Sequence, residues 1–312
     1  MNRGKVVVIG AGSVGTSVVY SILNQSLCEE IVIIDTNKNK AEGEALDMTH
    51  AMEFMSRKTI VRSGEYCDCS DADIIVITAS IPMSKEFRDR MTLLQKNKEV
   101  MKSICENIKA SGFDGIIIVV SNPVDVMSYY VLKYSGLKRN QVIGSGTALD
   151  TARLHYYIAR TIDVDPRSIN AFIIGEHGDT EMAAWSTATI GGKDIKSVFD
   201  DNKDRIGENP YVRFLEETRN GGWEVFSRKG NTSYGIAASV TGIVKTILFD
   251  ENRIYPVSVL LDGEYGVNDL FVSVPTIINN HGAKEIVELR LTDEESILFH
   301  HSCNVIKEKI NE

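Results

Sequence analysis

Three residues in the second half of the chain are of the types that proton transfer beside an anion requires. Asp150 and Arg153 lie three positions apart in an amphipathic segment, so on a helix their side chains project from one face. His177 follows an apolar run, within Gly175-Glu176-His177-Gly178-Asp179. Taken alone, the pair would be a surface ion pair and the histidine structural. A histidine that transfers protons to an anionic substrate needs an orienting carboxylate and an anion site nearby. This half of the chain offers the histidine, the carboxylate and an arginine for the anion.

A glycine-rich turn near the N-terminus predicts a dinucleotide site. An apolar run at residues 5–9 stops at Gly10-Ala11-Gly12-Ser13-Val14-Gly15, an amphipathic segment covers 16–27, and a second apolar run at 31–34 ends on Asp35. Glycines cluster in turns by chance. Here, however, the motif has the strand before it, the helix after it and the acidic residue beyond it that dinucleotide binding requires.

Each glycine of this turn has a separate physical role. Gly10 allows the tight turn, Gly12 lets the backbone approach a pyrophosphate, and Gly15 lets the helix pack closely on the strand. The diphosphate would bind the free N–H groups of the first helical turn, which begins with Ser13 and Val14. Asp35 should accept hydrogen bonds from the adenosine ribose and repel a 2′-phosphate, which predicts NAD as the cofactor in preference to NADP.

Composition places the chain among ordinary globular proteins. Its 312 residues suit one large or two medium domains, with 43% hydrophobic and 25% charged residues. A net charge of −9 counts against nucleic acid or an anionic membrane as partner, although local arginines could still bind a small anion. We see no signal peptide and no apolar run of membrane-spanning length.

The five scattered cysteines indicate a reducing compartment, hence the cytoplasm. Cys67-Asp68-Cys69 has no second Cys or His pair nearby in sequence, so we expect no metal site.

The first half of the chain alternates apolar runs with helical patterns. Strands are expected at residues 59–61, 73–78, 115–120 and 141–143, and helices at 41–55, 91–110 and 126–134. Strands that are apolar throughout predict a parallel sheet covered on both faces, which binds ligands beyond the carboxyl ends of its strands. The residues at such ends are Gly10, Asp35, Ser80, Asn122 and Ser145.

The pattern changes after residue 145, which predicts a Rossmann domain at residues 1–145 and an α+β substrate domain at 146–312. In the second domain we expect helices at residues 149–162, 211–219, 233–249 and 294–309, strands at 169–175 and 186–191, and antiparallel strands at 257–261 and 270–274. Residues 200–210 read as a polar, loose surface segment. The fold class is therefore α/β, a doubly wound parallel Rossmann sheet followed by an α+β substrate domain.

Four motifs resemble those of the L-lactate/malate dehydrogenase family in order and spacing: the glycine turn, Ser121-Asn122-Pro123-Val124-Asp125, Leu149-Asp150-x-Ala152-Arg153 and the segment around His177. The resemblance runs through nearly the whole chain. It is closest to bacterial L-lactate and L-2-hydroxyisocaproate dehydrogenases, which share the Gly-Gly…Lys-Gly-x-Thr-Ser-Tyr-Gly pattern of residues 221–235.

The resemblance implies a reversible, NADH-dependent reduction of pyruvate or a related 2-oxo acid to the L-2-hydroxy acid. In that reaction His177 is the general acid, Asp150 fixes its tautomer, and Arg153 grips the substrate carboxylate with two prongs. Asn122 hydrogen-bonds the substrate oxygen and also lies at the cofactor, while Ser145 binds the nicotinamide carboxamide. Thr232 and Ser80 are implied as further substrate and cofactor contacts, and the Asn122–Pro123 bond is expected to be cis.

The same resemblance places a catalytic arginine on the loop before residue 91. The spacing to Asn97 favours Arg90 as the group that polarises the carbonyl and binds substrate, with Arg88 as the rival. The family's glycine-rich specificity loop is replaced by Pro82-Met83-Ser84-Lys85-Glu86-Phe87-Arg88-Asp89-Arg90, which contains no glutamine. Met83 or Ser84 falls nearest the specificity position. No arginine is clearly placed there for a second carboxylate, which counts against malate.

Three alternatives stay open from the sequence. The loop at residues 82–90 is one residue longer than the family's, and its apolar Met83 and Phe87 would suit a larger substrate, as in L-2-hydroxyisocaproate dehydrogenase. Lys85 or Arg88 would suit an acidic substrate, as in malate dehydrogenase. A non-catalytic NAD-binding protein would keep the glycines without the other motifs. By analogy the protein is expected to be a homotetramer or a homodimer, with the helix after the glycine turn and the helix around residues 45–55 at a subunit contact.

Overall fold

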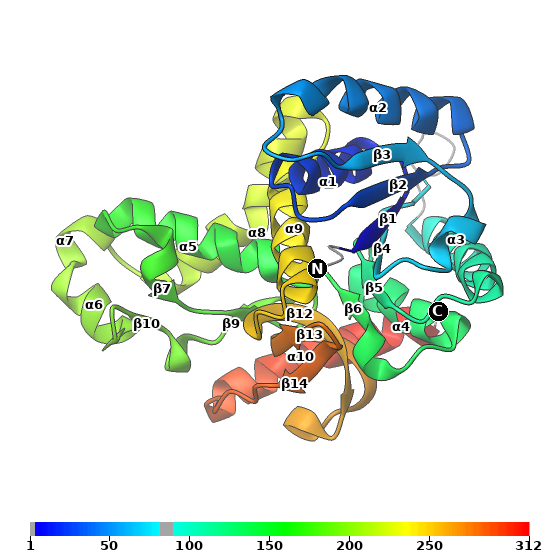
Figure 1. Ribbon diagram of the computed structural model, residues 1–312. Coiled ribbons are helices and arrows are strands. Elements are labelled where there is room, and N and C mark those ends of the chain that lie inside the picture. Colours follow the sequence, from blue (N-terminus) through cyan, green and yellow to red (C-terminus); the bar gives the residue numbers. More distant parts are fainter. Residues whose placement is uncertain (1–3, 82–89, 312) are drawn as a thin grey trace.

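A nine-stranded sheet forms the centre of the computed structural model, which describes residues 4–81 and 90–311 (Figure 1). The strand order is β14-β13-β12-β6-β5-β4-β1-β2-β3. Its six parallel strands are β1 (Lys5–Ile9), β2 (Glu30–Ile34), β3 (Ile60–Ser63), β4 (Ile74–Ile77), β5 (Ile116–Val119) and β6 (Val142–Gly144). The predicted doubly wound Rossmann sheet is therefore confirmed, and the carboxyl ends of these strands share one edge.

Helices cover both faces of the parallel strands, which explains why β1, β4 and β5 are buried along their whole length. Helix α1 (Ser13–Asn24) packs against α9 (Tyr234–Leu248), and α3 (Arg90–Ser111) packs against α4 (Val124–Ser135). Helix α2 (Lys38–His50) leads into β3. A strand with no solvated face has no polar positions, and this is the pattern that the sequence carries.

The second half of the chain extends the same sheet. Strands β12 (Arg253–Asp262), β13 (Asn268–Asn279) and β14 (Gly282–Ile286) are antiparallel, and β12 joins the parallel strands by pairing Ser258 with Gly144 of β6. The antiparallel pair expected at residues 257–261 and 270–274 is confirmed, with both strands longer than predicted. β14 was not predicted, because its residues are mostly half-exposed or exposed and show no buried run.

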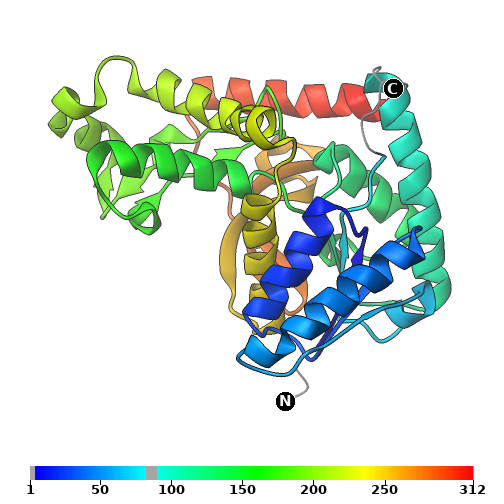
Figure 2. The ribbon, with the colours of Figure 1, turned by 90° about the horizontal axis from the view of Figure 1, so that it is seen from above.

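An arm with its own hydrophobic core projects from this sheet (Figures 1 and 2). It contains α5 (Ala148–Ile162), α6 (Ile195–Asp201), α7 (Lys203–Ile206), α8 (Pro210–Lys229) and a small sheet of β7 (Ile169–Asn170), β10 (Thr189–Ile190) and β11 (Lys193–Asp194). A hairpin of β8 (Ile173–Ile174) and β9 (Met182–Ala183) connects the arm to the large sheet through contacts with β13. Helix α10 (Asp293–Asn311) contacts α4, β13 and β9.

Three expectations for the second half were wrong in detail. Residues 169–175 form two short strands, β7 and β8, which pair in different sheets, and Gly175 has a φ of +95° that ends the second. In the segment 186–191 only Thr189–Ile190 is a strand, because residues 185–187 form a 3-10 turn. Residues 200–210 are not loose, since buried Ile206 anchors α7 in the core of the arm. Among the described residues, no helix is long and apolar enough to cross a membrane.

Phe214 should be a main support of the arm. Its ring is fully buried and lies 5.6 Å from that of Phe199, centroid to centroid. We expect Phe214→Ala to lower the free energy of unfolding by about 3–5 kcal/mol, through lost burial and the cavity left behind. The matched control is Val212→Ala on the same helix, where the side chain is 58% exposed and the free energy of unfolding should change little. Urea unfolding of both variants measures the difference, and equal midpoints would contradict the assignment of Phe214 to a core.

Candidate active site

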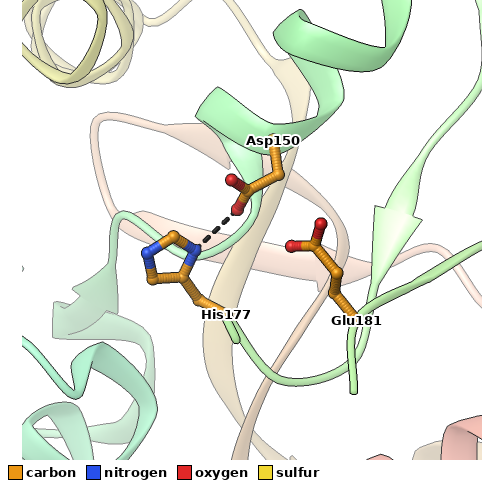
Figure 3. Close-up of side chains that lie close together, drawn as sticks. All are labelled: Asp150, His177 and Glu181. Carbon is orange, nitrogen blue, oxygen red and sulfur yellow. Dashed lines mark hydrogen bonds and ion pairs between the residues drawn. The ribbon is translucent and has the colours of Figure 1, made fainter. Parts of the chain in front are cut away.

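His177, Asp150 and Arg153 lie together in the structure. The Nδ1 of His177 donates to Oδ2 of Asp150 at 2.6 Å, and Nη1 of Arg153 donates to the other oxygen, Oδ1, also at 2.6 Å. Figure 3 shows the second ring nitrogen, Nε2, on the side of the imidazole away from Asp150. The three groups that the sequence singled out therefore form one hydrogen-bonded unit, with a ring nitrogen left to exchange a proton and a guanidinium beside it to bind an anion.

Two elements bring these groups together. Asp150 and Arg153 project from the first turns of α5, and His177 lies on the loop of the β8–β9 hairpin. This loop is pinned at Gly175, which exchanges two backbone hydrogen bonds with Ser273 of β13. A Cβ at Gly175 would come within 2.6 Å of Oγ of Ser302, so α10 also requires glycine here. The loop is thus held between β13 and α10 before any side chain of the site is considered.

Charge–charge attraction sets the ionisation of this unit. The side chain of Asp150 is 3% exposed, and burial opposes its charge, but His177 and Arg153 outweigh burial and lower its pKa. Attraction to Asp150 is the largest influence on His177 and raises the pKa of the imidazole to about 9, against the opposing effect of burial. At neutral pH the histidine therefore carries a proton and the aspartate does not.

Asp125 and Glu176 position the loop that carries His177, and neither residue was assigned a role from the sequence. The backbone N–H of His177 donates to Oδ2 of Asp125 at 2.9 Å, while Ser258 of β12 donates to Oδ1 at 2.6 Å. Burial raises the pKa of Asp125 to about 6. The backbone N–H of Glu176 donates to Oγ of Ser302 at 2.6 Å, and its carboxylate pairs with Lys309. The sequence carries little sign of these roles, because Ser258, Ser302 and Lys309 lie far along the chain from the residues that they contact.

Glu181 is a third acidic group at the site, also missed from the sequence. One ligand atom from each of Asp150, His177 and Glu181 lies within 4.8 Å of the others (Figure 3). Such a group has the spacing of a cation site. Both oxygens of Asp150 already accept hydrogen bonds, from His177 and from Arg153, and a metal ion would have to displace them. We therefore assign the cluster to proton chemistry, and the expectation that no metal is bound stays a prediction.

The glycine turn has the shape that a diphosphate needs. Gly10 has a φ of +111°, and a Cβ at Gly15 would lie 1.8 Å from the carbonyl oxygen of Gly10, so helix and strand meet there without side chains. A Cβ at Gly12 would meet no atom within 4 Å, so this glycine borders open space. Ser13 and Val14 open α1, which has no side-chain cap. These free N–H groups and the open space above Gly12 fit a dinucleotide.

Asp35 lies at the end of β2, beside this turn. Its carboxylate accepts hydrogen bonds from the backbone N–H groups of Ala11 at 2.6 Å and Asn37 at 2.8 Å. The residue is half-buried, so part of the side chain faces solvent at the carboxyl edge of the sheet. This position is the one a ribose-binding acid needs.

The other residues predicted for this edge lie at the ends of β4, β5 and β6. Ser80 and Asn122 are exposed, whereas Ser145 is 3% exposed and its N–H donates to the carbonyl oxygen of Val119. The Asn122–Pro123 bond is cis, as expected. Buried Asn97 of α3 connects the segments that follow β4 and β5. Its side chain accepts a hydrogen bond from the N–H of Ile81 and donates one to the carbonyl oxygen of Asn122.

The two remaining predicted substrate contacts are Thr232 and Arg90. Thr232 is half-buried in the segment between α8 and α9. Gly222 of α8 faces Arg153, where a Cβ would lie 3.4 Å from Nη2, so this helix closes over the guanidinium. The side chain of Arg90 lies outside the described part of the chain, as do Met83, Ser84, Lys85 and Arg88.

Comparisons with known proteins cover the whole chain. Residues 4–144 match the family model described as lactate/malate dehydrogenase, NAD binding domain, and residues 147–312 match the lactate/malate dehydrogenase, alpha/beta C-terminal domain. L-lactate dehydrogenase 1 of Bifidobacterium longum is 47% identical over 99% of this chain and 97% of its own. L-lactate dehydrogenase 3 of Bacillus cereus is 45% identical, over 98% of this chain and 97% of its own.

Solved structures agree with these sequence matches. The minor L-lactate dehydrogenase from Enterococcus mundtii, in its ligands-bound form, superposes with a TM-score of 0.96. It is 41% identical, and the match covers 100% of this chain and 98% of the other.

Removing the charge of Asp150 should reverse the ionisation of His177. In Asp150→Asn the largest influence that favours the imidazolium is gone and the effect of burial remains, so we expect the pKa of His177 to fall from about 9 to below its ordinary value of about 6.5. NMR titration of the imidazole signals measures this shift. The other histidine signals of the same sample serve as the control and should keep their titration curves. A His177 pKa that stays near 9 would show that Asp150 does not govern it.

Proposed function

The chain belongs to the lactate/malate dehydrogenase family, and from this premise we propose that it catalyses the reversible, NADH-dependent reduction of pyruvate to L-lactate. The observation that carries the proposal is the single hydrogen-bonded unit of His177, Asp150 and Arg153. It unites a proton donor, the carboxylate that holds its charge and a cation for an anionic substrate.

His177 is the proton donor in the direction of reduction. With a pKa of about 9 the imidazole is protonated at neutral pH, and it passes this proton to the carbonyl oxygen of the substrate from the ring nitrogen that Asp150 does not hold. Asp150 fixes the other nitrogen as a donor and stabilises the positive charge. In the reverse direction the neutral imidazole accepts the proton, so hydroxy-acid oxidation should gain from higher pH.

The other proposed contacts orient the substrate. Arg153 binds the carboxylate in two-pronged fashion, which keeps the 2-oxo carbon in a fixed position relative to His177. Asn122 binds the substrate oxygen, Thr232 contacts the substrate, and Arg90 polarises the carbonyl. All three are carried over from the family resemblance.

NAD is the cofactor, since the N-terminal family model is that of the NAD-binding domain; when bound, it supplies or takes up the hydride. We propose that the diphosphate is held by the turn at residues 10–15, where Gly10, Gly12 and Gly15 allow close approach and Ser13 and Val14 offer N–H groups. Asp35 binds the adenosine ribose. The nicotinamide end is held by Ser80, Asn122 and Ser145.

Pyruvate is favoured over a larger or a second acidic 2-oxo acid. The relatives and structural neighbours carry the name L-lactate dehydrogenase, which supports this reading over L-2-hydroxyisocaproate or malate dehydrogenase.

We also propose a domain division, an oligomeric state and a cellular location. We divide the chain into a cofactor domain at residues 1–145 and a substrate domain at 146–312, which the ranges of the two family models support. A homotetramer or homodimer in the cytoplasm is proposed by family analogy. Exposed apolar side chains on α1, α2 and the turn that follows support a subunit contact there: Tyr20, Leu46 and Phe54.

A substrate panel with NADH tests the reaction. Pyruvate should give the highest kcat/KM, ahead of 2-oxobutyrate, 2-oxoisocaproate and oxaloacetate, and the product should be the L-hydroxy acid. His177→Ala should lower kcat about 10²- to 10⁴-fold, the usual contribution of a general acid. His281→Ala removes an exposed histidine far along the chain and is the matched control. A preference for oxaloacetate, or an active His177→Ala, would overturn the substrate or the proton donor respectively.

Cofactor choice should depend on Asp35. We expect kcat/KM with NADH to exceed that with NADPH by more than about tenfold, which is about 1.4 kcal/mol, because the carboxylate repels a 2′-phosphate. Asp35→Ser should narrow the ratio by improving NADPH and weakening NADH. Initial rates with both cofactors at saturating pyruvate provide the measurement. A ratio near unity in the unmodified protein would mean that Asp35 does not face the ribose.

A further inference from the structure

Glu181 is a buried acid whose carboxylate lacks the partners that a buried charge needs. The residue is 2% exposed and ends the loop between β8 and β9 that also carries His177. Its Oε1 has no hydrogen-bond partner among the described residues. Figure 3 shows the carboxylate turned toward the space beside Asp150 and His177, and the three groups have ligand atoms within 4.8 Å of one another.

The charged groups that act on Glu181 come from α5, from its own loop and from α8. Helix α5 contributes Asp150 and Arg153, the shared loop contributes His177, and α8 contributes Arg219. Arg219 donates a hydrogen bond to the backbone carbonyl oxygen of Glu181, and none to the carboxylate is seen. Asp125 of α4 lies behind His177 and acts on the imidazole.

Two carboxylates this close in a buried site do not both ionise at low cost. Asp150 is the one that ionises, because both of its oxygens accept hydrogen bonds from charged donors, His177 and Arg153. Glu181 has a buried oxygen without a donor. The proton therefore belongs on Glu181.

We propose, on the premise of the proposed function, that Glu181 is a second proton-binding group of the active site, protonated in the enzyme form that accepts the 2-oxo acid. It is a positioning residue, which acts through the charges of His177 and Arg153. Once ionised, Glu181 would repel a substrate carboxylate at Arg153 and would hold the proton on His177 more tightly. Burial, followed by the charge of Asp150, raises the pKa of Glu181 to about 8, which supports the assignment.

The proposal predicts that activity falls at alkaline pH because two protons are lost from the active site. Reduction then requires protons on both Glu181 and His177, so kcat/KM for pyruvate should fall with a limiting slope of about −2 in a logarithmic plot against pH. In Glu181→Gln the neutral amide cannot titrate, and the slope should be about −1. The rise of KM at alkaline pH should be smaller in this variant, because no new negative charge develops beside Arg153.

The test compares these profiles from about pH 6 to about pH 10.5. Glu181→Asp, which keeps an acid, should retain the steeper slope, and Glu224→Gln, which removes an exposed acid of α8, should keep the wild-type profile. NMR titration of His177 without substrate gives an independent readout. The wild-type imidazole signal should show two inflections, one from its own ionisation and one from that of Glu181, and Glu181→Gln should show one.

Identical slopes and identical His177 titrations in the wild type and Glu181→Gln would overturn the inference. The NMR arm uses no substrate. A protein without activity on pyruvate would therefore refute the proposed function and still leave the role of Glu181 decided by the titration.

Discussion

The negative charge of Asp150 is the interaction on which the rest of the site depends. A carboxylate that is 3% exposed is stable as an anion only if donors replace its water, and here His177 and Arg153 each use one oxygen. The same pair of contacts raises the pKa of the imidazole and fixes the guanidinium. One buried charge thus prepares both the proton donor and the anion site, provided that α5 and the β8–β9 loop keep their relative positions.

The antiparallel strands that continue the Rossmann sheet help to keep α5 and the β8–β9 loop in these relative positions. Asp125 opens α4 at the end of the parallel strand β5, yet its carboxylate receives the backbone N–H of His177 and the hydroxyl of Ser258 on β12. Ser273 of β13 holds the backbone of Gly175, and Ser302 of α10 holds that of Glu176. The loop that carries the histidine is therefore fastened to strands and helices of both halves of the chain. A change in either half would alter the direction in which the imidazole points.

The sequence predicted those parts that depend on local periodicity. Apolar runs gave the parallel strands, the glycine turn gave the strand–helix junction, and the spacing of three gave Asp150 and Arg153 a common helix face. His177 was a candidate from its place after an apolar run and from the carboxylate and arginine in the same half of the chain, but its role as the general acid came from the family resemblance, because a lone histidine has no local signature. Glu181 was missed, since it lies on a loop, where spacing does not fix direction. The break within residues 169–175 was missed because strand partners far along the chain decide where each short strand ends.

Burial opposes the charge of each acid in this site, and the net change of pKa differs among them because their donors differ. Asp150 has two charged donors, so burial strengthens its attraction to His177 by excluding water. Asp125 has a hydroxyl and a backbone N–H, which leave its pKa raised only to about 6, and it is still an anion at neutral pH. Glu181 has a buried oxygen without a donor, and its pKa rises to about 8. The number and charge of donors, more than depth, therefore determine which acid carries charge and which carries a proton.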